Sequence, residues 1–190
     1  MSTTRATLLD RVRDPRDEAA WEEFFALYAP LLRSYALGLG LSVADAEDIR
    51  DQCLSTVVQR IASFHYDRAK GSFKGWLHRI ARNKVHDELR RPRKGQAETA
   101  QLAALPDESE GPDEVWERHW RAEHLRFALA EVLRSQDQTG RELAVLLFDE
   151  QLSGAQIAER LGWNTNQVYK ARSRLLADLR LVLKRLGEDD

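Results

Sequence analysis

Cysteine is almost absent from this sequence, and long apolar runs are missing altogether. The single cysteine among 190 residues, Cys53, can form no internal disulfide and offers no thiolate pair for zinc. No window approaches the roughly 18 uninterrupted apolar residues of a membrane span, and the opening MSTTRATLLDRVRD lacks the apolar segment of a signal peptide. We therefore expect a cytoplasmic protein with no metal, no cofactor and no membrane insertion.

A strong net charge is missing too, because 29 Lys and Arg residues oppose 31 Asp and Glu residues for a formal charge of -2. A hydrophobic fraction of 43% excludes a disordered chain, which would lack core-forming residues. Taken alone, the slightly acidic total argues against binding to nucleic acid. The distribution of the charge along the chain removes that argument.

The charge is sorted into blocks. Residues 14–51 hold nine acidic and three basic residues, and residues 95–116 hold six acidic residues and no basic one. By contrast, residues 66–94 hold ten basic and three acidic residues, and residues 170–185 hold six basic residues and one acidic. This order indicates two surfaces for a polyanion and a separate surface for a basic partner.

The apolar pattern predicts an all-α protein. Bulky apolar residues recur at helical spacing, and no run alternates in the manner of a strand. Residues 92–112 contain three prolines and two glycines without a sustained apolar period, which is typical of a linker. We expect two small helical domains, at residues 5–91 and 113–187, joined by this acidic flexible linker.

In the first domain, helices are expected over residues 18–37, with core aromatics, and from a cap at Ser42 through Ile61. The apolar side of the second of these helices includes Cys53, which we interpret as a small buried hydrophobe. The polar side is either a solvated face or a docking surface for a basic partner. That side holds Asp45, Asp48, Gln52, Ser55, Thr56 and Gln59.

A further helix beginning near Phe73 interleaves aromatic and basic residues with Asn83. Cations neutralise phosphates, rings stack on exposed bases and amides bond to base edges, so the mixture suits single-stranded nucleic acid. The alternative is that Phe73 and Trp76 belong to the core and the cations are solvated. No HExxH spacing supports catalysis, so we predict no catalytic or metal site among His65, His78, His86, Asp87 and Glu88.

The second domain has the layout of a helix-turn-helix. Ser153 and Gln156 form a capping box, and Gly162 supplies the turn. The next helix presents amides first and cations after, as a recognition helix does, although a plain helical hairpin is the alternative. A preceding helix over residues 113–134 is expected to contribute Trp116 and Trp120 to the core of this domain.

These motifs resemble the extracytoplasmic-function (ECF) group of sigma-70 family RNA polymerase sigma factors. LYAPLLRSYALGLGLSVADAEDIRDQCL and FHYDRAKGSFKGWLHRIARNKVHDELRR are similar to region 2 of that family. GRELAVLLFDEQLSGAQIAERLGWNTNQVYKARSRL is similar to region 4, and the ordered pair is more specific than either motif alone. The resemblance implies a promoter-recognition subunit, not an enzyme.

The resemblance implies two partners for this chain: core RNA polymerase, through the β′ clamp helices and the β flap, and promoter DNA. The residues implied for docking on core polymerase are Asp45, Asp48, Asp51 and Gln52. Those implied for the single-stranded -10 element are Tyr66, Lys70, Phe73, Lys74, Trp76, Arg79, Arg82, Asn83 and Lys84. Those implied for the -35 duplex are Asn164, Thr165, Asn166, Gln167, Tyr169, Lys170, Arg172, Ser173 and Arg174.

Ser55 and Thr56 are candidate phosphorylation sites, because added negative charge there would strengthen binding to a basic partner; otherwise they are ordinary surface hydroxyls. The sequence leaves open whether an anti-sigma factor or a Ser/Thr kinase regulates the protein. Two other functions also stay open. One is a helix-turn-helix regulator that binds duplex DNA without polymerase, and the other is a helical enzyme using residues near His86.

Overall fold

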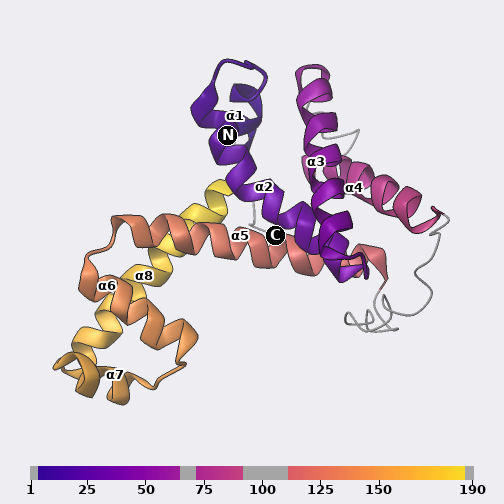
Figure 1. Ribbon diagram of the computed structural model, residues 1–190. Helices are drawn as coiled ribbons and strands as arrows, with labels where there is room; N and C mark the ends of the chain where they lie inside the picture. The colour runs from indigo at the N-terminus through magenta and orange to yellow at the C-terminus, as the bar shows by residue number, and fades with distance from the viewer. Residues whose placement is uncertain (1–3, 65–71, 92–110, 187–190) are drawn as a thin grey trace. The chain divides into compact units, whose positions relative to one another are not determined.

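A computed structural model describes residues 4–64, 72–91 and 111–186, and every regular element in those ranges is helical (Figure 1). Contacts divide the chain into two units, residues 1–123 and 124–190. The predicted all-α, two-domain architecture is confirmed. In the described ranges no helix is long and apolar enough to span a membrane. Tyr66, Lys70 and most of the predicted linker lie outside the described residues.

Unit 1 begins with a series of helices that are capped by short polar side chains. The elements are α1 (Thr4–Arg11), α2 (Glu18–Gly38), α3 (Val43–Arg60), the 3-10 turn η1 (Ile61–Ser63) and α4 (Phe73–Leu89). Asp17, Ser42 and Ser72 each accept a hydrogen bond from a backbone N–H in the first turn of α2, α3 and α4. The predicted cap at Ser42 is therefore confirmed, although α3 ends at Arg60 and the chain continues as η1.

The core of unit 1 is built on the aromatic residues of α2. Phe24, Tyr28 and Tyr35 are fully buried, as the pattern predicted. Phe73 of α4 packs against two of these rings, with centroid separations of 6.0 Å to Phe24 and 5.3 Å to Tyr28. The inner side of α3 includes buried Cys53, whereas Val58 of the same helix is 46% exposed.

Helix α5 (Pro112–Ser135) contributes residues to both units. Its first half packs within unit 1, where the Trp116 ring lies 5.1 Å from that of Tyr35 and the Trp120 ring lies 5.9 Å from that of Tyr28. Both indoles are 1% exposed. The prediction that they supply the core of the second domain was wrong, because an apolar helix face does not specify which partner will cover it.

Unit 2 contains the predicted helix-turn-helix. Its further elements are α6 (Gln138–Ala144), the π-helical turn η3 (Val145–Asp149), α7 (Gly154–Leu161) and α8 (Thr165–Leu186). The Ser153–Gln156 capping box starts α7, and Gly162 ends it in the left-handed conformation with φ 64°. Ile157 of α7 and Val168 of α8 share a core with Leu143 and Leu146, which fixes α8 against α7.

Gly162→Ala should lower the free energy of unfolding of unit 2 by about 1–2 kcal/mol, because a Cβ disfavours the left-handed conformation. An added Cβ meets nothing within 4 Å, so the effect comes from the backbone alone. Urea unfolding of the full chain, followed by circular dichroism, measures it. Gly154→Ala is the matched control, since its Cβ also meets nothing and its φ is not positive. Equal losses in the two variants would contradict the prediction.

Candidate functional site

The structure distributes the predicted site residues over three helices, α3 and α4 in unit 1 and α8 in unit 2. On α3, Asp48 and Asp51 are exposed, whereas Asp45 and Gln52 are half-buried. We call these four residues the acidic surface. They project from the side of α3 opposite its buried stripe, so the helix presents carboxylates while its other side holds the core.

Local hydrogen bonds orient two carboxylates of the acidic surface. Ser42 Oγ donates to Asp45 Oδ2 at 2.7 Å, and Arg50 Nε donates to Asp51 Oδ1 at 2.7 Å. The hydrogen bond from Arg50 lowers the pKa of Asp51 and so stabilises its ionised form. Asp48 makes no ion pair with any residue that the structure describes, which leaves its charge available to a partner.

The two candidate phosphorylation sites on α3 differ in accessibility. Ser55 is exposed, and its Oγ accepts a long hydrogen bond of 3.4 Å from Gln59 Nε2. Thr56 is half-buried, and its hydroxyl donates to the carbonyl of Gln52 at 2.8 Å, one helical turn earlier. Only Ser55 therefore presents a hydroxyl that a modifying enzyme reaches without breaking a short internal hydrogen bond.

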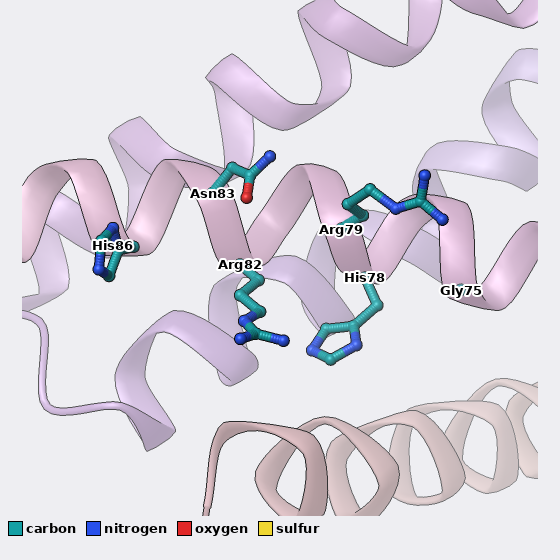
Figure 2. A pocket seen from close by; sticks show the side chains of 6 residues that line it. All are labelled: Gly75, His78, Arg79, Arg82, Asn83 and His86. Atoms are coloured by element: carbon teal, nitrogen blue, oxygen red, sulfur yellow. The ribbon is translucent and has the colours of Figure 1, made fainter.

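Helix α4 carries the described part of the predicted -10 surface. An open pocket of about 340 Å³ lies along it, lined by Gly75, His78, Arg79, Arg82, Asn83 and His86. His78 and Arg82 extend to one side of the helix and Asn83 to the other (Figure 2). Burial on α4 is graded: Arg79, Arg82 and Asn83 are exposed, Lys74, Trp76 and Lys84 are half-buried, and Phe73 is buried.

The two aromatic residues of α4 are not equivalent. Phe73 is 2% exposed and packs against the ring of Phe64 at 5.8 Å, so it is part of the core and offers no face to a base. This departs from the expectation that Phe73 lies beside melted bases. Trp76 is half-buried and leans on Phe64 at 4.8 Å and on Phe73 at 5.6 Å. Trp76 is therefore the aromatic residue of α4 whose surface is available for stacking.

Lys74, His78 and Arg82 follow one another at four-residue steps on α4 and meet carboxylates of α5 within unit 1. Lys74 Nζ lies 2.7 Å from Glu117 Oε2, and Arg82 lies 3.7 Å from Asp113 Oδ1. Burial lowers the pKa of His78, which favours the neutral ring. These pairs were not predicted, although the matching four-residue spacing of Asp113 and Glu117 was present in the sequence.

All nine residues predicted to read the -35 duplex are exposed on and just before α8. Asn164 and Gln167 bond reciprocally, since the N–H of each donates at 2.9 Å to the side-chain oxygen of the other. This arrangement caps α8 and anchors its first turn. Tyr169 is 74% exposed. The N-terminal half of α8 thus presents amides, a phenol and cations on one side, with Val168 and Leu175 buried on the other.

Comparison with known proteins gives two family matches in the same order along the chain. Residues 24–95 match sigma-70 region 2, and residues 141–180 match a homeodomain-like domain. The chain is 30% identical over 176 residues to the ECF RNA polymerase sigma factor RpoE of Cereibacter sphaeroides, covering 93% of this chain and 92% of that protein. It is 25% identical over 178 residues to the ECF RNA polymerase sigma factor SigE of Mycolicibacterium smegmatis, covering 90% and 66%. Among solved structures, CnrH in complex with the cytosolic domain of CnrY aligns over 98% of this chain and 99% of that one, with 18% identity and a TM-score of 0.39.

A region 2 domain followed by a helix-turn-helix domain defines the class of RNA polymerase sigma factors. The chain belongs to the ECF group of the sigma-70 family. Its relatives are named as sigma factors, which favours that function over the DNA-binding regulator and the helical enzyme that the sequence left open. Among the described residues, no group of three or more His, Cys, Asp or Glu side chains is placed to hold a metal ion.

The thiol of Cys53 should resist labelling in the folded protein at about pH 8, because it is neither accessible nor ionised. The side chain is fully buried on the inner side of α3, and burial raises the pKa of Cys53 from 9.0 to about 12. Release of the coloured thiol of Ellman's reagent measures the rate, with the protein in 8 M urea as the fully reactive control. Fast labelling of the folded chain would contradict the packing of α3.

Proposed function

We propose that this chain docks on core RNA polymerase through the acidic surface of α3 and directs it to promoters. In this proposal α4 opens and reads the -10 element as a single strand, and α8 reads the -35 element in the major groove. One observation carries the proposal: the exposed carboxylates Asp48 and Asp51 lie on α3, whereas exposed cations such as Arg79 and Lys170 lie on α4 and α8, and a buried apolar stripe holds each of these helices. A protein with one basic and one anionic partner needs this separation.

The docking step relies on charge complementarity with a basic partner. Asp48 and Asp51 project from the exposed side of α3, and the hydrogen bond from Arg50 lowers the pKa of Asp51. Charges arranged in this way steer association and penalise a partner of the same sign. The expected partner surface on core polymerase is the β′ clamp helices, and the β flap is the expected partner of unit 2.

The -10 step relies on the exposed side of α4. Arg79 supplies a cation for a phosphate and Asn83 an amide for a base edge, since both are exposed. Trp76 offers a partly exposed ring for stacking. At Gly75 an added Cβ would meet only Ser72 Oγ, at 3.7 Å, so the backbone is open to close approach. Tyr66 and Lys70, which lie outside the described residues, stay predictions for this surface.

The -35 step relies on α8. A recognition helix reads bases with residues near its N-terminus and holds phosphates with the cations that follow. Asn166 and Gln167 precede Lys170, Arg172 and Arg174 along the exposed side, which matches that order. An anti-sigma factor and a Ser/Thr kinase stay predictions made from the sequence, as does a cytoplasmic location.

Asp48→Arg should weaken association with core polymerase by about tenfold or more, because a like charge then faces the basic partner. Co-migration on gel filtration and initiation on candidate promoter fragments, with purified core polymerase, measure the effect. Glu22→Arg makes the same charge change at an exposed position of α2 and should leave association unchanged. The proposal fails if the wild-type chain neither co-migrates with core nor supports specific initiation.

Arg174→Ala should weaken binding to a -35 duplex about tenfold and reduce the salt dependence by about one released counterion. Arg174 lies on the exposed side of α8, whereas Arg180 is exposed six residues further along the same helix. Arg180→Ala is therefore the matched control. Titrations at several salt concentrations, followed by fluorescence anisotropy, separate the two variants. Identical slopes and affinities for both would remove Arg174 from the interface.

A further inference from the structure

Arg13 joins two parts of unit 1 that lie 51 residues apart in the sequence. It stands in the turn between α1 and α2, and its Nη2 donates to the carbonyl of Phe64 at 2.6 Å. Its Nη1 lies 3.3 Å from Asp10 Oδ1 of α1. Its Nε is buried and has no hydrogen-bond partner among the residues that the structure describes. The guanidinium is therefore packed against unit 1, with one of its terminal nitrogens directed at Phe64.

The turn that carries Arg13 is anchored on both sides. Arg11, the last residue of α1, donates from Nε and Nη2 to the two carboxylate oxygens of Asp17 at 2.9 and 2.8 Å. Asp17 also caps α2, so this ion pair ties the end of α1 to the start of α2. Three apolar side chains of the same segment are buried: Leu8, Leu9 and Val12. Arg13 thus extends from a backbone that is fixed independently of Phe64.

Phe64 is the residue at which the 3-10 turn η1 ends. Its N–H donates to the carbonyl of Ile61 at 3.1 Å, within that turn. Its own carbonyl accepts the bond from Arg13, and a cation at the C-terminal end of a helical turn is favoured by the peptide dipoles. A charged donor also makes a stronger hydrogen bond than a neutral one. The backbone of Phe64 is therefore held on its amide side by η1 and on its carbonyl side by Arg13.

The ring of Phe64 supports the aromatic side chain that α4 leaves at the surface. Its centroid lies 4.8 Å from that of Trp76, with 38° between the planes, and 5.8 Å from that of Phe73, with 81° between the planes. Phe73 is fixed in the core by the rings of α2. Trp76 is half-buried, with Phe64 and Phe73 on its inner side. The orientation of the Trp76 ring therefore depends on where Phe64 lies.

We propose that Arg13 is a positioning residue for the stacking of a DNA base on Trp76. This inference rests on the proposed function of α4 in -10 binding. Arg13 acts through Phe64 and not on the strand itself: it fixes the Phe64 carbonyl, and the Phe64 ring supports Trp76. A ring that is already held in its binding orientation loses less conformational entropy when a base stacks on it. The core of unit 1 rests on the rings of α2, α4 and α5, so loss of Arg13 should not unfold the unit.

Arg13→Met tests the role of the guanidinium, because it keeps an unbranched apolar side chain and removes the donor. The probe is a fluorescein-labelled single-stranded DNA of random sequence, since stacking on an aromatic ring tolerates every base. It is titrated with the full chain bound to core polymerase, with core alone as the blank, and followed by anisotropy. Arg13→Met should weaken binding about fivefold, the cost of ordering one side chain. Arg16→Met removes the same charge from an 88% exposed side chain of the same turn and should leave binding unchanged.

Two further measurements separate positioning from a structural role. Arg13→Lys keeps a charged donor for the Phe64 carbonyl, so it should bind the probe within about twofold of the wild type. Circular dichroism of Arg13→Met should show the wild-type helix content. A loss of helix content, or binding by Arg13→Lys as weak as that of Arg13→Met, would overturn the proposal.

A double-mutant cycle shows whether Arg13 acts through Trp76. Trp76→Ala alone should weaken binding about tenfold, because it removes one stacked ring. If Arg13 serves only to hold that ring, the double variant Arg13→Met with Trp76→Ala binds like Trp76→Ala alone. Independent contributions would multiply to about fiftyfold and would overturn the proposal.

The same titrations separate failure of the positioning role from failure of the proposed function. If Trp76→Ala weakens binding while Arg13→Met binds like the wild type, the positioning role is overturned and the proposed role of α4 stands. If Trp76→Ala and Arg79→Ala both bind like the wild type, the proposed role of α4 falls, and the positioning role falls with it. Weaker binding by Arg13→Met, recovery in Arg13→Lys and no further loss in the double variant together support the proposal.

Discussion

The contact of aromatic rings between α2 and its neighbours is the interaction on which the rest of unit 1 depends. Phe24, Tyr28 and Tyr35 lie on one side of α2 and are too large to be covered by a single helix. Phe73 covers part of this surface from α4, and Trp116 and Trp120 cover more of it from α5. Because the rings of α4 and α5 pack on the same rings of α2, α4 and the first half of α5 are brought together.

The same contact of aromatic rings decides which charged side chains of unit 1 face one another. Once α4 and α5 meet through their rings, the cations beside the rings of α4 face the carboxylates beside those of α5. Helix α3 packs on α2 and α4 from another side and keeps its carboxylates at the surface. The net charge of -2 is therefore the sum over three charged surfaces, on α3, α4 and α8. Those of α3 and α8 are exposed, whereas that of α4 is partly neutralised by carboxylates of α5.

Local features were the most predictable from the sequence. The cap at Ser42, the capping box of Ser153 and Gln156, and the turn at Gly162 depend on bonds between residues a few positions apart, and all are present as expected. The exposed side of α8 was equally predictable, because a helix of 22 residues with a regular apolar stripe leaves little choice of buried side. The family could also be inferred, since two ordered motifs carry it.

Contacts between distant segments could not be predicted in the same way. Phe73 and Trp76 are both aromatic residues of α4, and the sequence does not distinguish them. Packing against Phe64 and α2 makes Phe73 a core residue and leaves Trp76 at the surface. Trp116 and Trp120 were assigned to the wrong core for a related reason. Their apolar character predicts burial but does not name the surface that buries them.

The sequence by itself determined the helical fold, the order of the two domains, the caps and the separation of acidic from basic segments, because these depend on neighbours along the chain. Only the tertiary structure decided which aromatic rings are available to a ligand and which cations of α4 are already paired, because both depend on the helix that lies opposite. Burial of the rings is what brings that helix close, and Gly38 of α2 permits the approach because a Cβ there would lie 2.9 Å from Val115 Cγ1 of α5.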